Sequence, residues 1–226
     1  MTAPTRPAGL RRFVPGSAAE PSARDVAQDT PPRATEHCGL CDAPVEERHG
    51  HVVDRHDQRL ACACRPCYLL FTGEWNGGRY RAVPQRYLVD SRHPVTASAW
   101  EALQVPVGVA FFIRGMAGRQ VAAFYPSPAG ATECLLDLPA WNRLVEDLPL
   151  LSAAEPEIEA ILVRRTADGV QGYLVPVDSC YELVGAMRTS WRGFDGGAEA
   201  NARIDAFFDT VARRARELAP TEGAEP

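Results

Sequence analysis

The sequence predicts an α+β protein in which a small four-cysteine module precedes an antiparallel four-stranded sheet with packed helices. Two C-x-x-C pairs lie in the first third of the chain, and two stretches of alternating apolar residues follow, each succeeded by a helical pattern. A period of two is typical of strands, and a period near 3.6 is typical of helices. Strands and helices that alternate in this way favour helices layered on a sheet.

The four-cysteine module is predicted from the segment His37 to Thr72, which holds five of the seven cysteines and four of the five histidines. Twenty-two residues separate the pair Cys38 and Cys41 from the pair Cys64 and Cys67. Two residues between thiolates let both sulfurs of a tight turn face one ion. We therefore expect these four cysteines to bind one metal ion, with zinc as the first choice and iron as the alternative.

The residues between the two pairs predict a β-hairpin. Val45 to Asp54 and Gln58 to Ala63 are suited to two strands around the turn at 55–57. The second pair then runs into an apolar stretch, Tyr68 to Phe71, that we interpret as the start of a helix. Pair, hairpin and pair at a helix start resemble the order of a treble-clef or zinc-ribbon module.

The remaining cysteines and histidines are given other roles. Cys62 is expected to lie beside the metal ligands without binding the ion, or to replace one of them, because it shares a strand face with Cys64. Any of His37, His49, His51 and His56 could substitute for a sulfur, although solvated hairpin residues are the simpler interpretation. Cys134 and Cys180 are expected to be small apolar core residues.

The second part of the chain predicts two hairpins and three main helices. Strands are expected at Val105 to Ile113, Gln120 to Tyr125, Ile158 to Arg165 and Gln171 to Val177. Helices are expected at Pro139 to Asp147, from a capping box formed by Ser179 and Glu182, and after Gly197, with a short helix at Ala97 to Leu103.

Composition restricts the function. The net charge is −5, and residues 36–92 contain eight arginines against eight acidic residues, which argues against a nucleic-acid partner. All 24 basic residues are arginine, so a catalytic or phosphate-binding lysine is excluded. No apolar stretch is long enough for a signal peptide or a membrane span, and we expect a cytoplasmic protein.

Four regions are expected from these patterns. Residues 1–35 contain many prolines and no periodic apolar pattern, which predicts a disordered tail. Residues 36–92 form the metal-binding module, residues 93–218 the α+β domain and residues 219–226 a flexible tail.

Two glycine-bearing loops are candidates for contact with a partner or ligand. The stretch Pro126 to Glu133 is interpreted mainly as a connecting loop, and the stretch Trp191 to Gly197 as an interhelical turn. The candidate contact residues are Ser127, Gly130, Thr132, Glu133, Arg192 and Asp195. A hydrolase has little support, because His93 is the only histidine outside the module and a four-thiolate zinc is closed to water.

The chain also resembles an uncharacterised bacterial family encoded beside high-affinity, actinobacterial-type nickel–iron hydrogenases. The matching stretches are HCGLC, ACACRPCYLLF, GGRYRAVP, PVGVAFF, AFYPSPAGATE, EAILVRR and CYELVGAMRTSWRGFDGG. The resemblance implies accessory work in assembling or supporting a hydrogenase.

The leading hypothesis is therefore a non-catalytic zinc-binding accessory protein that contacts a hydrogenase subunit or maturation factor. A rubredoxin-like one-iron electron-transfer protein is the alternative. A small-molecule enzyme or sensor that uses the α+β domain is a third hypothesis.

Overall fold

The computed structural model describes residues 36–73, 77–105, 107–115, 120–127, 129–136, 138–192 and 197–219. The predicted tail at 1–35 and nearly all of the tail predicted at 219–226 lie outside these residues. The chain from Thr35 onward groups into one compact unit. Within its described part, the unit contains a three-stranded and a seven-stranded sheet, and it has no helix of the length and apolarity that a membrane crossing needs.

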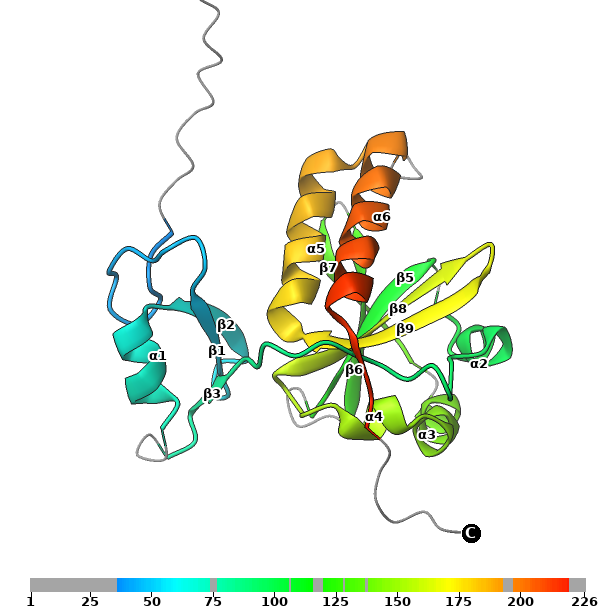
Figure 1. Cartoon of the computed structure of the whole chain (residues 1–226), viewed down its shortest axis with the longest axis horizontal. Coiled ribbons are helices and arrows are strands. Elements are labelled where there is room, and N and C mark those ends of the chain that lie inside the picture. The colour runs from blue at the N-terminus through cyan, green and yellow to red at the C-terminus, as the bar shows by residue number, and fades with distance from the viewer. Residues whose placement is uncertain are drawn as a thin grey trace, which may run out of the picture. The chain divides into compact units, whose positions relative to one another are not determined.

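The smaller sheet carries the cysteine-rich segment and has the order β2-β1-β3, antiparallel throughout. Its strands are β1 (Gly50–Asp54), β2 (Arg59–Ala63) and β3 (Tyr80–Ala82). The Asp54 carboxylate accepts the backbone N–H groups of His56 and Asp57, which stabilises the turn between β1 and β2. Helix α1 (Arg65–Phe71) begins directly after β2. The predicted hairpin and helix are both present in this segment (Figure 1).

The larger sheet has seven strands, so the prediction of four strands is wrong. Its order is β10-β4-β9-β8-β5-β6-β7, and every neighbouring pair is antiparallel except β10 with β4. The strands are β4 (Leu88–Val89), β5 (Val109–Arg114), β6 (Val121–Ser127), β7 (Gly130–Cys134), β8 (Glu159–Thr166), β9 (Gly169–Pro176) and β10 (Arg216–Glu217).

The three unpredicted strands share one property, which is that they lack the apolar alternation of a half-buried strand. Strands β4 and β10 have two residues each, too few to show any period. Strand β7 lies at the edge of the sheet, and only Gly130 of its five residues is buried. Their pairing therefore depends on the neighbouring strands rather than on their own pattern.

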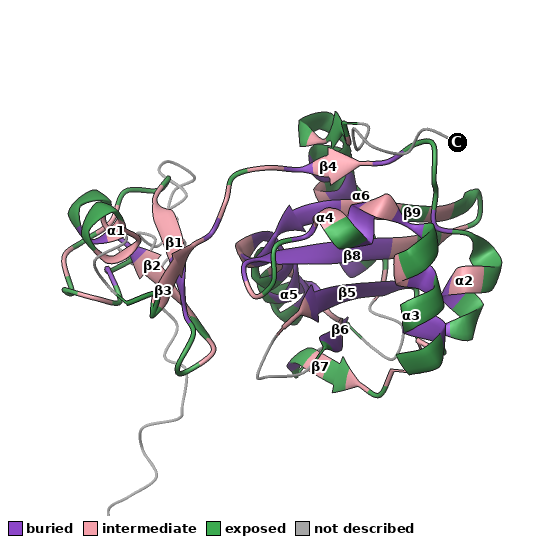
Figure 2. Cartoon of the chain, turned by 90° about the horizontal axis from the view of Figure 1, so that it is seen from below, coloured by how far each residue is buried: buried purple, intermediate pink, exposed green. Residues whose placement is uncertain are grey.

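The central strands β5 and β8 are buried on both faces (Figure 2). Phe111 and Ile113 point to one apolar cluster, whereas Ala110 and Phe112 point to the other. This division follows from the alternation of side chains along a strand. Helices α5 (Val177–Ser190) and α6 (Gly197–Arg214) cover the first face.

Three shorter helices cover the second face. They are α2 (Ala97–Ala102), α3 (Leu138–Asp147) and α4 (Pro149–Ala153). The ring of Trp141 in α3 lies 5.1 Å from the ring of Phe112 in β5, centroid to centroid, and both side chains are almost completely buried. The large sheet is thus enclosed between two helical layers, and the general α+β class is confirmed.

Helix α5 begins three residues earlier than the predicted capping box, which would make Ser179 the N-cap residue. Pro176 occupies the N-cap position and makes no side-chain cap hydrogen bond. Ser179 is buried inside the first turns, where its hydroxyl lies 2.7 Å from the hydroxyl of Tyr87. Because Val177 is buried in the core, packing sets the start of this helix.

Several contacts connect the small sheet to the large one. Val53 and Val83 belong to the same apolar cluster as α5 and α6. Arg81 donates to the carbonyl oxygen of Pro156 at 2.7 Å, and the Arg55 guanidinium donates to Glu157, also at 2.7 Å. Strand β4 lies within residues 36–92 of the sequence, yet it pairs with β9 of the large sheet. The two sheets are therefore packed against each other and joined by hydrogen bonds.

Candidate metal centre

The first cysteine pair lies on a tight turn at the start of the described chain. The N–H of Asp42 donates to the carbonyl oxygen of Cys38 at 2.9 Å, and the N–H of Cys38 donates to Ala43 at 2.8 Å. Asp42 adopts a φ of 62°, the left-handed conformation that lets the chain reverse directly after Cys41. The turn is therefore a knuckle of the kind that the C-x-x-C spacing predicts.

The second pair lies where β2 passes into α1. Cys64 is the N-cap residue of this helix and Cys67 lies in its first turn, as does Pro66, whose missing N–H costs no helical hydrogen bond there. The N–H of Gly39 in the first knuckle donates to the carbonyl oxygen of Cys62 at 2.8 Å. This hydrogen bond holds the first knuckle against the strand that leads to the second.

These two knuckles bring the four predicted ligands together. The sulfurs of Cys38, Cys41, Cys64 and Cys67 all lie within 4.8 Å of one another. The Cys41 and Cys64 sulfurs are 3.7 Å apart, close to the ~3.8 Å edge of a tetrahedron with Zn–S bonds of about 2.3 Å. The spacing and the all-thiol donor set fit a single tetrahedral ion such as zinc or iron.

The cluster has a buried side and an accessible side. Cys38 and Cys67 are 3% and 8% exposed, whereas Cys41 is exposed and Cys64 half-buried. Burial alone would raise the pKa of Cys38, but N–H groups of Cys64, Leu40 and Cys41 outweigh it and lower this pKa to about 6. Burial and the neighbouring thiols raise the pKa of Cys67 to about 12. Backbone N–H groups of both knuckles thus favour a thiolate at Cys38.

Cys62 is not a member of the four-sulfur group. It lies opposite His51 in the β1–β2 pairing, and its sulfur groups instead with the rings of His49 and His51. Burial and the carboxylate of Glu36 raise the pKa of this thiol. The side chains of the other two histidines are more exposed, at 49% for His37 and 82% for His56. The His37 ring bonds the carbonyl oxygen of Asp42, and the His56 ring bonds the Asp57 carboxylate.

The prediction of a connecting loop at Pro126 to Glu133 is wrong. This stretch ends β6 and forms most of β7, with Ser127 opposite Gly130. The hydroxyls of Ser127 and Thr132 lie 2.8 Å apart across the hairpin, and Glu133 is further along β7, opposite Phe124. Four of the candidate contact residues therefore belong to one edge hairpin.

The second candidate contact region is only partly described. Arg192 is exposed just after α5, and its guanidinium lies 3.5 Å from the carbonyl oxygen of Trp191. Asp195 lies outside the described residues. Of the two predicted core cysteines, Cys180 is fully buried in α5, whereas Cys134 at the end of β7 is half-buried.

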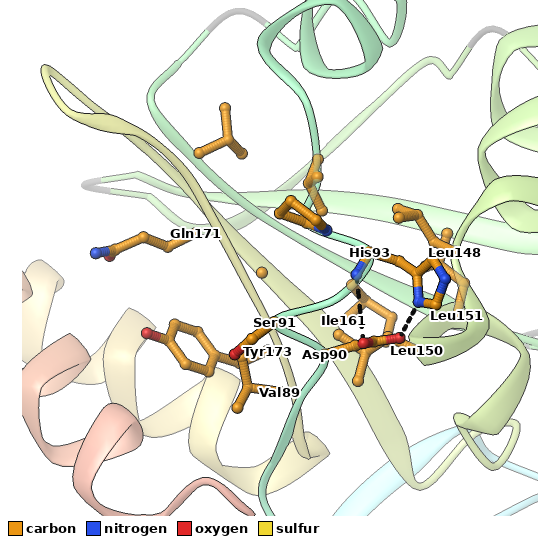
Figure 3. A pocket seen from close by; sticks show the side chains of 14 residues that line it. Val89, Asp90, Ser91, His93, Leu148, Leu150, Leu151, Ile161, Gln171 and Tyr173 are labelled. Carbon is orange, nitrogen blue, oxygen red and sulfur yellow. Dashed lines mark hydrogen bonds and ion pairs between the residues drawn. The ribbon is translucent and has the colours of Figure 1, made fainter. Parts of the chain in front are cut away.

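The large sheet also borders a cavity of about 200 Å³ between β9, α4 and the chain after β4. Its lining is mostly apolar, and its main polar feature is the pair Asp90 and His93 (Figure 3). The buried Asp90 carboxylate accepts from His93 Nδ1 at 2.9 Å and from the N–H groups of Arg92 and His93. Burial would raise the pKa of Asp90, but these hydrogen bonds lower it overall.

The sequence patterns used above predict no partner for His93. The D-x-x-H spacing is the signal that could have identified Asp90 as its partner. An aspartate side chain in a turn often accepts the backbone N–H groups of the residues two and three positions later. Asp90 makes this local turn, so its hydrogen bonds organise the segment that borders the cavity.

Comparison with known proteins matches most of the chain to a family model. The model of a family described as "Family of unknown function (DUF5947)" matches residues 37–215. No curated protein and no solved structure matches the chain. The matched range begins beside the first knuckle and ends after α6, so it includes both sheets. The match agrees with the expected resemblance to an uncharacterised family.

Proposed function

The chain belongs to the family of unknown function DUF5947, and we propose from its own residues that it is a non-catalytic accessory protein built around one structural zinc ion. Cys38, Cys41, Cys64 and Cys67 would hold this ion. The observation that carries the proposal is the approach of all four sulfurs to within 4.8 Å of one another. Zinc bound by four thiolates would contribute folding energy and leave no open coordination position.

The local architecture supports zinc over iron. The first knuckle is followed by a hairpin, and the second knuckle runs directly into a helix. This is the order of a treble-clef module, in which zinc fixes a hairpin to a helix. In that arrangement the ion would link β1 and β2 to α1. It would stabilise this short segment, whose own apolar core is too small to hold it folded.

Iron bound by the same four cysteines is the second candidate, and one observation favours it. Cys41 is exposed, so one edge of the cluster reaches the surface, as electron exchange with a partner would require. An iron site would make the protein a rubredoxin-like electron carrier. Against this, the residue after the second knuckle is Tyr68 within α1, where a rubredoxin knuckle has a glycine.

An accessory function requires a surface for a protein partner. Helix α1 exposes two adjacent leucines, Leu69 and Leu70, at 58% and 66%, next to the cysteine cluster. Exposed apolar side chains that lie together are typical of protein contact sites. We propose that the partner is a nickel–iron hydrogenase subunit or maturation factor, on the basis of the sequence resemblance.

Metal analysis of the purified full chain tests the choice of ion. A colourless protein with zinc supports the structural role, whereas a red protein with iron and a reversible one-electron reduction supports electron transfer. A chain that binds neither metal at the four cysteines would contradict both.

The accessory function is tested in cells that lack the protein. We expect reduced hydrogen uptake together with incompletely processed hydrogenase. Normal uptake with fully assembled hydrogenase would contradict the hypothesis. Lost uptake with normally assembled hydrogenase would favour the electron carrier.

A further inference from the structure

A second cluster of metal-binding side chains lies on the β1–β2 hairpin. His49, His51 and Cys62 each place one ligand atom within 4.8 Å of the others. None of the three belongs to the four-cysteine group. The cluster therefore needs an explanation of its own.

Strand geometry explains why these three side chains meet. His51 and Cys62 are directly opposite each other in the antiparallel pairing of β1 with β2. Residues two apart in an extended chain point to the same side, so His49, just before β1, faces the same way as His51. The two imidazole rings accordingly lie 4.7 Å apart, centroid to centroid. The register of one hairpin thus fixes the whole cluster.

Both histidines use the same ring nitrogen for a supporting hydrogen bond. His49 Nδ1 lies 2.7 Å from the carbonyl oxygen of Glu46, and His51 Nδ1 lies 2.9 Å from the carboxylate of Asp178. A neutral imidazole that donates from Nδ1 carries its lone pair on Nε2. Metal-binding histidines are typically held in this way, with one nitrogen on a carbonyl or carboxylate and the other on the ion.

The Nε2 atom of His49 is buried and has no hydrogen-bond partner among the described atoms. Its side chain is only 7% exposed. A buried polar atom without a partner is unfavourable and indicates a missing group. The nearest carboxylate oxygen, on Glu36, is 3.7 Å away, too far for a hydrogen bond. This orphaned lone pair is the observation that points to a ligand.

We propose that His49, His51 and Cys62 form a second metal site that takes a divalent transition-metal ion of the zinc class. Two imidazoles and one thiolate are borderline ligands that suit Zn²⁺ and its spectroscopic substitute Co²⁺. Three protein ligands leave a fourth position, and the exposed carboxylate of Glu36 lies on the side of His49 where it can reach that position. This site does not depend on the identity of the ion at the four cysteines.

The two sites differ in chemistry. The four-cysteine site is closed, whereas three ligands with an open or exchangeable fourth position are typical of ions that exchange, bind small ligands or activate water. Through Asp178 the second site is also hydrogen-bonded to the first turn of α5. An ion at this site would therefore fix the hairpin against the helical layer of the large sheet.

The first experiment measures metal stoichiometry in the full chain after saturation with Zn²⁺ and removal of excess ion. The wild type is expected to hold about two zinc ions, and Cys62→Ser and His49→Ala about one, because each removes one ligand of the second site. His56→Gln is the matched control: it changes an exposed histidine of the same hairpin and should retain the wild-type stoichiometry. One zinc ion in the wild type, unchanged by Cys62→Ser and His49→Ala, would overturn the proposal.

The second experiment titrates Co²⁺ into the wild type, so its main result does not depend on the folding of any variant. A four-thiolate site and a mixed imidazole–thiolate site give different d–d and sulfur-to-cobalt charge-transfer bands. Two successive spectral components during the titration are expected, and the weaker-binding component should be missing in Cys62→Ser. A single all-sulfur component that saturates at one Co²⁺ per chain would overturn the second site while leaving the four-cysteine site intact.

Discussion

The Nδ1 atom of His51 lies 2.9 Å from the Oδ2 atom of Asp178, although the two residues are 127 positions apart in the chain. His51 belongs to β1 of the small sheet, and Asp178 belongs to the first turn of α5. Both side chains are at least three-quarters buried. The hydrogen bond therefore connects the metal-binding hairpin to the helical layer of the large sheet.

Asp178→Ala should weaken this connection in two ways. We expect a loss of about 1 kcal/mol in the free energy of unfolding, because the variant removes a hydrogen bond and a favourable charge at a helix N-terminus. We also expect zinc affinity at the second site to fall by about tenfold or more, since Asp178 orients a ligand. Urea unfolding and competition with a chelator measure the two effects.

Glu182→Ala provides the matched control for Asp178→Ala. It removes the same charge from the same helix at an exposed position one turn later. Stability and zinc affinity should remain close to those of the wild type. If the two variants behave alike, charge on α5 rather than the contact with His51 is responsible.

Removing a ligand of the four-cysteine site should unfold the small sheet. Cys67→Ser leaves three thiolates and places a hydroxyl at a buried position of the cluster. Structural zinc contributes on the order of 10 kcal/mol to modules of this kind. We expect loss of that metal ion and rapid proteolysis within residues 36–82. Cys134→Ser, which changes a thiol outside both clusters, should keep the metal and the protection. Full zinc retention in Cys67→Ser would refute the ligand assignment.

The Asp54 carboxylate should contribute stability that depends on pH. Hydrogen bonds from Arg79 chiefly, and from the backbone of His56 and Asp57, outweigh burial and lower its pKa from 3.8 to about 2. A carboxyl whose pKa is lower in the folded state stabilises the fold above its unfolded pKa, and the effect is lost as the pH falls towards 2. Because the Arg79 side chain is half exposed and its charge is screened by water, the Asp54 carboxylate should contribute only about 1–2 kcal/mol to the free energy of unfolding.

Asp54→Asn measures this contribution. Its stability deficit relative to the wild type should be largest at neutral pH and should shrink as the pH falls from 5 towards 2. Metal release in acid affects both proteins, so the difference between their unfolding free energies isolates Asp54. A deficit that stays constant across this range would show that the carboxylate charge is not involved.

The pair Glu159 and Arg86 should be sensitive to the loss of one partner. Glu159 is fully buried and accepts two hydrogen bonds from Arg86, at 2.6 and 2.7 Å, and one from the N–H of Glu155 at 2.8 Å. Arg86→Met should cost about 3–5 kcal/mol, because it leaves a buried carboxylate without its counter-charge. Thermal or urea unfolding measures the loss.

Two further variants show whether the stability loss of Arg86→Met comes from the unpaired charge of Glu159. Adding Glu159→Leu to Arg86→Met should restore part of the stability, since the uncompensated charge is then removed. Arg203→Ala, which breaks an exposed pair with Glu199, should cost less than about 1 kcal/mol. An equally small effect of Arg86→Met would indicate that Glu159 is already neutral in the folded protein.

The α+β domain is predicted to fold without the metal module. The structure adds a condition, because β4 pairs with β9 and β10, and Tyr87 packs in the core of the large sheet. A fragment that begins at Pro84 should therefore be folded and cooperative without metal, whereas one that begins at Val95 should be less stable. An aggregated, non-cooperative Pro84 fragment would show that the two sheets share one indispensable core.

The sequence alone determined the features that depend on local chemistry. The spacing of Cys38 and Cys41, and of Cys64 and Cys67, predicted two knuckles, because two residues between thiols define a tight turn. The apolar alternation of β5, β8 and β9 predicted strands, and the apolar stripe of α6 predicted a helix, because each period matches the geometry of its element. In each case the signal lies within a few residues of the feature.

Only the tertiary structure decided which distant segments meet. Strands β4, β7 and β10 have too few apolar positions to be predicted from the sequence. They form because neighbouring strands of the large sheet pair with them. The grouping of His49, His51 and Cys62 depends on the register of one hairpin, which a shift of a single residue would destroy. Asp178 reaches His51 only because α5 packs where it does. Such contacts join residues far apart in the chain, and no local pattern encodes them.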